Sequence, residues 1–535
     1  MLLIHNVICT VLISIGLLFP DLFLGYYKGM LSCTIPITTL FGITGFASIL
    51  SCIKNSKFLY TLITLLIIAQ CIQINHWTYF GAPIHSQDIS KVFFEIDEIF
   101  QTGISNTKSL WPAWFTITFM AALLYTGIIT PRKRFHVPYM SLVAIVCLSI
   151  NPALSFIKGP SFFYTKPTAS TIYNTSRAFS DWFVNSRSYL PKIKFKPYQI
   201  AYSKPLVKNI VFILGESQSS RYMHLYGYAK PNTPFLTSIK NDANFAYTKG
   251  ISSSVSTITA LQLFFNNFYN PGFIELIRNK SSNLFRLARH QGYKTFIISG
   301  QNEKLFHDTG TEFVDYFIFE KNLREQQLQK GDEALLDSFA NLEFSDKNFI
   351  VIHLRHIHSP FGDYAKYLPE QPPSDTDNSR TNQTQKEYAT AIAYNDYWVK
   401  KCIDLVKTKL PKDTVIIFTS DHGELVGEDG LFGHNLMLPE VVDVPIWAYA
   451  LNADTSLNNY LKSQTVCSHY DLSKQIAHLM GATIVNPNEN DSLQFVHGTE
   501  MQTNYEVMPW KKTNNNKAEF LQNQRVDDIL SQYFS

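Results

Sequence analysis

The stretch Thr419–Glu424 reads TSDHGE and follows directly on the short apolar run Asp413–Phe418. That run is rich in β-branched residues, so it predicts a buried strand. Asp421 and His422 then lie at the carboxyl end of the strand, where open α/β sheets hold their ligands. A carboxylate beside an imidazole is a donor pair suited to zinc. The pair alone is equally compatible with a capped turn. Potential ligands at the ends of other strands are therefore needed to favour a metal site.

A second apolar run, Asn209–Leu214, ends in an acid in the same way, because Gly215 and Glu216 follow it directly. Two strands that both lead into potential metal ligands favour one site at their carboxyl ends. The chain has no CxxC pattern. A metal would therefore be held by oxygen and imidazole rather than by thiolates.

Histidines follow the predicted strands as well. The apolar run Asn348–Leu354 contains His353 and leads into His356 and His358, and another histidine lies in the loop after TSDHGE. A single histidine is more often structural, and we interpret His353 and His356 as structural or supporting residues. The histidines favoured for function are His358, His422 and His434.

A nucleophile is suggested by the hydroxyl-rich run Ile251–Leu261, ISSSVSTITAL. Its second half predicts a helix start, where a hydroxyl lies beside free N–H groups that bind phosphate. Coordination to zinc would lower the pKa of such a hydroxyl and activate it. N-capping explains the run equally well. The residues alone do not choose among Ser254, Ser256, Thr257 and Thr259.

The first part of this 535-residue chain is dominated by long apolar runs that carry few charges or none. Each is near the roughly 20 residues needed to cross a bilayer, which predicts a multi-pass anchor. A cleavable signal peptide is disfavoured for the first run, because it lacks a basic start and a small-residue cleavage site. The predicted spans are Leu2–Tyr27, Leu31–Ile53, Phe58–Asn75, Leu110–Pro131 and His136–Ile157.

The basic residues of the short loops set the predicted orientation. Lys54 and Lys57 separate spans two and three, and Arg132–Arg134 separate spans four and five. Such loops are cytoplasmic by the positive-inside rule. With five spans, everything after Lys158 is then exported.

The segment Gln87–Phe100, between spans three and four, places most of its apolar residues on one helical face. We expect a helix in the outer membrane interface that borders a lipid substrate. A packing helix is an equally good interpretation.

The exported part alternates apolar strands with helical patterns, which predicts a doubly wound, mostly parallel α/β sheet. The strands expected are Asn209–Leu214, Lys294–Ser299, Asn348–Leu354, Thr414–Phe418 and Val444–Ala450. The helices expected are Ser282–Gln291, Asp332–Leu342, Lys386–Val406 and Asp471–Leu479. The polar stretch Pro372–Gln385 predicts a surface loop.

The predicted organisation is a membrane domain of five helices (1–157), a bridging segment with one helix (158–205) and a catalytic domain (206–535). Of seven cysteines, only Cys402 and Cys467 lie in the exported part, so at most one disulfide is available there. A net charge of +3 is too small to indicate a nucleic-acid partner.

A spaced set of motifs resembles the phosphoethanolamine transferases of the alkaline-phosphatase/sulfatase superfamily. The resemblance covers nearly the whole chain, and members have five spans before a periplasmic catalytic domain. The motifs are GES at 215–217, LYGY at 225–228, NTP at 232–234, SDHGE at 420–424 and GH at 433–434.

This resemblance implies a zinc site of Glu216, Thr257, Asp421 and His422, with Thr257 as the nucleophile. His358 and His434 are implied to contact the phosphoryl group or a second zinc. The implied reaction moves phosphoethanolamine from phosphatidylethanolamine to lipopolysaccharide (core sugar or lipid A) through a phospho-threonine, releasing diacylglycerol. The implied setting is the bacterial inner membrane with a periplasmic catalytic domain, and we expect a monomer.

The sequence departs from the family pattern in two ways. The lipid A-modifying members carry several disulfides, and members commonly have Cys-Gly where Val255 and Ser256 precede Thr257. The run Thr257–Leu261, TITAL, resembles more closely the disulfide-poor members that modify the lipopolysaccharide core. Alternatives are a phosphoglycerol transferase of the lipoteichoic-acid-synthase type and an inactive sensor on the same fold. Sulfatase activity is disfavoured, because the exported part has no Cys/Ser-x-Pro-x-Arg run.

Overall fold

The structure is a computed structural model, and the chain divides into two compact units, Met1–Ser188 and Tyr189–Ser535. The bridging region is shared between them, because its helix belongs to the first unit and its strand to the second. The residues described are 2–27, 37–53, 56–81, 83–84, 88–89, 110–129, 171–185, 194–368, 380–490, 493–499, 501, 505–513 and 517–534.

The first unit is helical. Three of its helices are long and apolar enough to cross a membrane, over Ile4–Leu24, Ser56–Phe80 and Trp111–Ile129. They correspond to predicted spans one, three and four. The described helices are α1 (Leu2–Tyr27), α2 (Ile37–Cys52), α3 (Ser56–Phe80), α6 (Trp111–Ile129) and α8 (Thr171–Asn185).

Predicted span two coincides with α2, whose 16 described residues fall short of a full crossing. The residues before it, 28–36, lie outside the described part. So do predicted span five and, apart from residues 88–89, the segment Gln87–Phe100. These predictions stand as predictions.

Small residues allow α1 and α6 to approach closely, as membrane helices commonly do. A Cβ on Gly127 would lie 2.8 Å from Cγ1 of Ile13, so a larger residue would push the helices apart. Helix α8 contacts α1 and α3 through polar groups. The Thr171 amide donates to Asp21 Oδ1 at 2.6 Å, and Gln70 donates to the Thr175 hydroxyl at 3.0 Å.

The second unit is built around an eight-stranded sheet with the order β11-β3-β10-β7-β2-β6-β4-β5. The five strands from β7 to β5 are mutually parallel, which confirms the predicted doubly wound, mostly parallel sheet. The bounds are β2 (Asn209–Gly215), β3 (Phe245–Ile251), β4 (Lys294–Ser299), β5 (Tyr316–Ile318), β6 (Asn348–His353), β7 (Thr414–Ser420), β10 (Asp443–Leu451) and β11 (Val466–Ser468).

One strand absent from the prediction, β3, pairs antiparallel with β10, and β10 is itself antiparallel to β7. Its sequence, FAYTKGI, is interrupted by Lys249 and Gly250, which weakens the strand pattern. Gly250 is required here because a Cβ would lie 2.8 Å from side-chain atoms of Val444 and Ile446 on β10. Because this contact joins strands far apart in sequence, no local sequence pattern indicates it.

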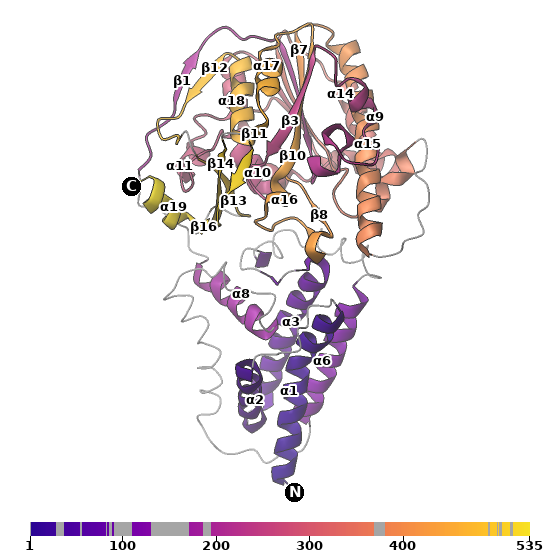
Figure 1. Cartoon of the computed structure of the whole chain (residues 1–535), viewed down its shortest axis with the longest axis vertical. Coiled ribbons are helices and arrows are strands. Elements are labelled where there is room, and N and C mark those ends of the chain that lie inside the picture. Colours follow the sequence, from indigo (N-terminus) through magenta and orange to yellow (C-terminus); the bar gives the residue numbers. More distant parts are fainter. Residues whose placement is uncertain are drawn as a thin grey trace. The chain divides into compact units, whose positions relative to one another are not determined.

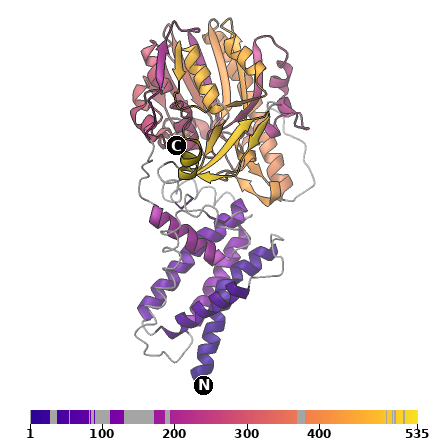
Figure 2. The ribbon, with the colours of Figure 1, turned by 60° about the vertical axis from the view of Figure 1, so that its left-hand side comes forward.

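Alternate residues of β2 face two hydrophobic cores, one on each side of the sheet. Figures 1 and 2 show helices on both sides. The first core is covered by α10 (Thr257–Phe265), α11 (Ile274–Asn279), α12 (Leu284–His290), α17 (Ser456–Ser463), α18 (His469–Leu479) and α19 (Val526–Tyr533). The second is covered by α9 (Pro234–Ser238), α13 (Glu320–Lys330), α14 (Glu333–Ala340) and α15 (Arg380–Lys409).

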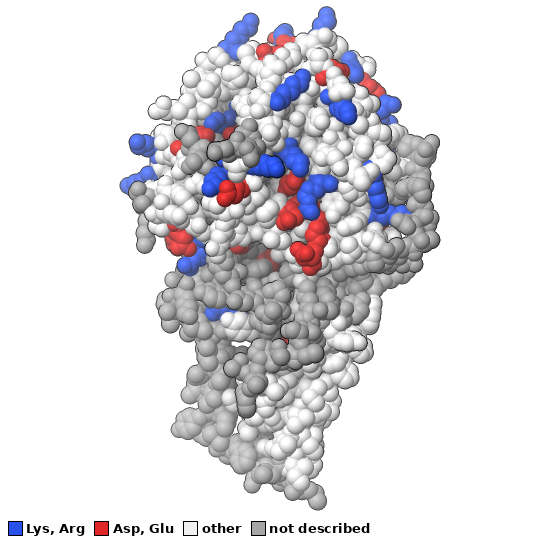
Figure 3. All heavy atoms as spheres, in the orientation of Figure 1, with Lys and Arg blue, Asp and Glu red and all other residues white. Residues whose placement is uncertain are grey.

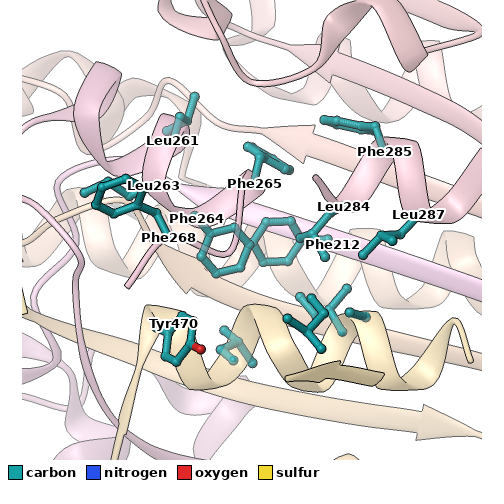
Figure 4. Packing of buried hydrophobic residues seen from close by; sticks show 14 of the residues in the cluster. Phe212, Leu261, Leu263, Phe264, Phe265, Phe268, Leu284, Phe285, Leu287 and Tyr470 are labelled. Carbon is teal, nitrogen blue, oxygen red and sulfur yellow. The ribbon is translucent and has the colours of Figure 1, made fainter. Parts of the chain in front are cut away.

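Aromatic rings fill the first core. Phe212 on β2 stacks on Phe264 of α10, with ring centroids 4.9 Å apart and planes inclined by 5°. Figure 4 shows this pair between α10 and α18. The contact packs the C-terminal end of α10 against the middle of β2.

Helix α15 begins at Arg380, so the predicted loop Pro372–Gln385 is wrong over residues 380–385. Polar side chains suit an exposed helical turn as well as a loop, and the last proline of the stretch is Pro373. Residues 372–379 lie outside the described part.

Cys402 on α15 and Cys467 on β11 are both free and buried. They belong to cores on opposite faces of the sheet. The two cysteines therefore do not form the one disulfide that the sequence allowed.

Short strands complete the second unit. The C-terminal ones form a separate sheet next to the hydroxyl-rich run, because Ser254 bridges to His497. The remaining elements are β1 (Gln199–Tyr202), β8 (Leu425–Val426), β9 (Phe432–Gly433), α16 (Pro439–Val442), β12 (Ala482–Val485), β13 (Gln494–His497), β14 (Glu506–Lys512), β15 (Ala518–Phe520) and β16 (Gln524–Arg525).

Figure 3 shows basic and acidic side chains intermixed over the visible face of the second unit. No extended basic face is visible in that view. This distribution agrees with the small net charge of the chain, +3.

Candidate metal and active site

The register of two neighbouring strands brings the acids together. In the parallel pair β2 and β7, Gly215 lies opposite Ser420. The next residues, Glu216 and Asp421, therefore leave the sheet at the same level. Ligand atoms of Glu216, Asp421 and His422 all lie within 4.8 Å of one another, and all three residues are buried.

The ring of His422 is oriented by its own loop. Its Nδ1 lies 2.9 Å from the Gly423 carbonyl, which can only accept, so Nδ1 carries the proton. In the neutral ring the lone pair is then on Nε2. That nitrogen lies 3.3 Å from Asp421 Oδ2 and 3.6 Å from Glu216 Oε1. A lone pair that faces two carboxylates is the arrangement of a metal site.

Asp421 supplies a direct test of whether these residues fit a cation. Its Oδ1 accepts hydrogen bonds from the backbone amides of Ser217, at 3.0 Å, and His422, at 2.8 Å. Its Oδ2 is buried and has no hydrogen-bond partner among the residues the structure describes. A buried carboxylate oxygen is costly when nothing pairs with it. A divalent cation bound between Asp421, Glu216 and His422 would remove that cost.

The two carboxyl groups influence each other strongly. Burial raises the pKa of Glu216, but the electrostatic interactions with His422 and His358 and the hydrogen bond from the Gln301 amide outweigh it and hold this pKa at about 2. Burial, and then the charge of Glu216, raise the pKa of Asp421 well above its usual value. Two buried acids at this separation need a cation if both are to ionise. The donor set of two carboxylates and one imidazole suits zinc.

Thr257 is the first residue of α10, and its hydroxyl faces this cluster. Its Oγ1 lies 3.2 Å from His422 Nε2 and donates to Glu216 Oε2 at 3.4 Å. The three other candidate hydroxyls, those of Ser254, Ser256 and Thr259, point elsewhere, to backbone carbonyls of Gly498 and Thr499. These contacts are Ser254 to Gly498 at 3.0 Å, Ser256 to Thr499 at 3.5 Å and Thr259 to Thr499 at 2.8 Å.

His434 lies beside the cluster rather than in it. Its ring centroid is 4.2 Å from that of His422, and its Nδ1 contacts Glu424 Oε2 at 3.0 Å. His422, Glu424 and His434 form a second group whose ligand atoms lie within 4.8 Å. Glu424 is thus a site residue to which the sequence assigned no role, although it belongs to the TSDHGE stretch.

His358 lies in the loop after β6, as the sequence places it. Its Nδ1 contacts the Ser359 carbonyl at 2.7 Å. Its electrostatic interaction with Glu216 is among the causes that lower the pKa of that carboxyl.

The two histidines predicted to be structural both lie against polar side chains. His356 lies between Asp332 Oδ2, at 2.9 Å, and Asn395 Oδ1, at 2.7 Å. His353 contacts Ser299 Oγ at 3.0 Å, and burial lowers its pKa to about 4, so it is neutral at neutral pH. Both hold the loops around the cluster.

Gln301 was missed by the sequence reasoning. It follows β4 by two residues, and its side-chain nitrogen donates to Glu216 Oε2 at 2.7 Å. The signal that identified Glu216, a polar residue just beyond a buried strand, applies to Gln301 too. An amide is not a usual metal ligand or nucleophile, so this position alone does not indicate a role for Gln301.

The family model described as Sulfatase matches residues 208–482. Among curated proteins, the phosphoethanolamine transferase EptA of Helicobacter pylori is 23% identical over 61% of this chain and 64% of its own length. The Kdo(2)-lipid A phosphoethanolamine 7''-transferase of Salmonella typhimurium is 23% identical over 55% of each chain. The chain thus spans less than two thirds of the length of these relatives.

A solved structure shares the fold of both units. It is the integral membrane lipooligosaccharide phosphoethanolamine transferase A of Neisseria meningitidis, with a TM-score of 0.60 and 18% identity. The superposition covers 88% of this chain and 95% of that one. The fold of the part covered, apolar helices included, is therefore one that a membrane protein is known to adopt.

Proposed function

The chain belongs to the sulfatase family, and from this premise we propose that it is a membrane-anchored, zinc-dependent phosphoethanolamine transferase. The donor we propose is phosphatidylethanolamine, and the acceptor is lipopolysaccharide, at a core sugar or at lipid A. The observation that carries this proposal is the Thr257 hydroxyl, which faces Glu216 and His422 at a site that fits a divalent cation. Sulfate ester hydrolysis is not proposed, because the required Cys/Ser-x-Pro-x-Arg run does not occur in the second unit.

In the first step we propose that Thr257 Oγ1 attacks the phosphorus of the donor lipid. The Oγ1–P bond forms and the bond from phosphorus to the glycerol oxygen breaks, so phosphoethanolamine stays on Thr257 and diacylglycerol leaves. The proton that Thr257 loses balances the one that the glycerol oxygen gains. In the second step an acceptor oxygen attacks the same phosphorus, loses its proton, and Thr257 recovers its hydroxyl.

Glu216, Asp421, His422 and Thr257 are the residues we propose to hold zinc. When bound, zinc would lower the pKa of the Thr257 hydroxyl and offset negative charge on the phosphoryl oxygens. His358 and His434 are the groups we assign to proton transfer and to contact with the phosphoryl group. Glu424, 3.0 Å from His434 Nδ1, would hold that ring in one orientation.

The apolar helices of the first unit support a membrane-bound donor, since a two-chain lipid does not diffuse to a soluble enzyme. We propose that they anchor the chain in the bacterial inner membrane and that the second unit lies in the periplasm. The basic loops at Lys54 and Lys57 and at Arg132–Arg134 support this orientation.

The function is tested with the purified full-length chain, zinc, lipopolysaccharide and phosphatidylethanolamine labelled in its head group. We expect the label to appear on lipopolysaccharide and diacylglycerol to be released in equal amount. Transfer from phosphatidylglycerol instead would favour the phosphoglycerol transferase, and no transfer from either lipid would contradict the proposal. Mass spectrometry of the modified lipopolysaccharide then identifies the acceptor position.

The proposed orientation makes a separate prediction. Alkaline phosphatase fused after Asn209 is expected to be active in cells, because that enzyme folds only outside the cytoplasm. A cytoplasmic reporter at the same position should be silent. The opposite pattern would show that the second unit is cytoplasmic.

A further inference from the structure

Gln301 links three neighbouring strands of the sheet at their carboxyl ends. It follows β4, which lies next to β6, and β6 lies next to β2. Its side-chain nitrogen lies 2.8 Å from the carbonyl of Leu354, just after β6, and 2.7 Å from Glu216 Oε2, just after β2. The side chain is 1% exposed. It therefore reaches across the end of β6 to a proposed metal ligand.

The surroundings decide which end of the amide faces Glu216. A carboxylate oxygen and a backbone carbonyl can only accept hydrogen bonds, so the atom between them has to be the amide nitrogen. A third neighbour, His353 Nε2, lies 3.1 Å from the same nitrogen. An amide oxygen in this position would face two acceptors at hydrogen-bond distance. The positions of the amide nitrogen and the amide oxygen therefore cannot be exchanged.

The remaining contacts of Glu216 show what this bond does. Its Oε1 accepts from the Ser217 hydroxyl at 2.8 Å, and its Oε2 from Gln301. Thr257 approaches Oε2 as well, at 3.4 Å. With a donor on each oxygen, the carboxylate is held in one rotation about its terminal bond. That rotation determines which lone pairs are directed at His422, Asp421 and Thr257.

We propose that Gln301 is a positioning residue for Glu216, which fixes the orientation of this carboxylate toward the metal and the nucleophile. The inference rests on the proposed function, since it assigns Gln301 a role in that same site. Hydrogen bonds to a ligating carboxylate commonly contribute 10–100-fold in metal affinity or activity. A residue that only filled space would not contribute to either through its amide.

Gln301→Met tests this proposal, because methionine keeps the length and bulk of the side chain and removes the donor. We expect zinc affinity, measured by competition with a chromophoric chelator on the full-length chain, to fall by roughly 10–100-fold. At limiting zinc kcat should fall by a similar factor, with an unchanged KM for the donor lipid, and added zinc should restore part of it. Gln301→Asn keeps the amide but shortens the side chain by one methylene. It should lower zinc affinity and kcat as Gln301→Met does.

Gln327→Met is the matched control. The Gln327 amide donates to the carbonyl of Gly300, next to Gln301, at 3.1 Å and to Asp332 at 3.1 Å. It therefore supports the same loop without contacting Glu216, and its substitution should leave zinc affinity unchanged. Wild-type affinity in both Gln301 variants, or an equal loss in Gln327→Met, would overturn the inference. A wild-type chain that binds no zinc would instead contradict the proposed function itself.

Discussion

Replacing Thr257 by alanine is expected to abolish transfer, with a loss of several orders of magnitude in kcat, while the protein still folds. Loss of a nucleophile has effects of this size. The loss of stability should be small, below about 1 kcal/mol, because Thr257 follows the N-cap position and its side chain caps no backbone group. Label transfer from phosphatidylethanolamine and the thermal unfolding midpoint measure the two quantities.

The neighbouring hydroxyls provide the controls for Thr257. Ser254→Ala, Ser256→Ala and Thr259→Ala each remove a hydrogen bond to the carbonyl of Gly498 or Thr499. Each should cost about 1 kcal/mol of stability and keep measurable activity. Without acceptor, the wild type should accumulate phosphoethanolamine on the peptide that contains Thr257. An adduct on another residue, or an active Thr257→Ala enzyme, would reject this nucleophile.

The second large effect is expected for Asp421→Ala, which should lose tightly bound zinc and nearly all transfer. Asp421 Oδ2 is a buried carboxylate oxygen without a hydrogen-bond partner in the described part of the chain, and it faces the other candidate ligands, so its partner should be the metal. The variant is dialysed against a chelator and then returned to limiting zinc. The zinc content of the protein after this treatment measures the loss. Full zinc occupancy in the variant would exclude Asp421 as a ligand.

The metal-free protein offers an independent measurement of the same site. Asp421→Asn keeps an oxygen for the amides of Ser217 and His422 but removes the carboxylate that burial and the charge of Glu216 disfavour. Without zinc, this variant should unfold at a higher temperature than the wild type. With zinc the order should reverse, because only the wild type gains binding energy. A wild type that is the more stable without zinc would argue against a site built for a cation.

Asp396 is the matched control for Asp421. It is also buried and also accepts two backbone amides, from Phe235 at 2.8 Å and Leu236 at 3.0 Å, but it lies on α15 and contacts none of the proposed ligands. Asp396→Ala should lose roughly 1–3 kcal/mol of stability for each amide left unpaired and retain its zinc. Comparing Asp421→Ala with Asp396→Ala therefore distinguishes the effect of losing a metal ligand from the effect of losing a buried carboxylate.

Much of the fold could be predicted because its signals are local. Apolar length identifies helices long enough to cross a membrane, and five buried β-branched runs identify the strands β2, β4, β6, β7 and β10. The residues that follow β2 and β7 could be named as candidate ligands for the same reason. In a parallel sheet, strand ends share an edge, so a polar residue after each strand is placed by topology before any contact is known.

What depended on contacts between distant segments could not be predicted. The residues alone did not single out Thr257 among four hydroxyls, although the family resemblance implied it. The structure distinguishes it through the C-terminal segment, because the carbonyls of Gly498 and Thr499 bind the other three side chains. Strand β3 exists because Gly250 allows close packing on β10, which no local pattern records.

The role of Gln301 has the same origin. The strand order β2-β6-β4 brings this amide to Glu216, although 85 positions separate them in the chain. The sequence by itself therefore determined which kinds of residue stand at the sheet edge and that apolar helices precede them. Only the tertiary structure decided which side chains face one another, because register, strand order and packing set distances that sequence separation does not encode.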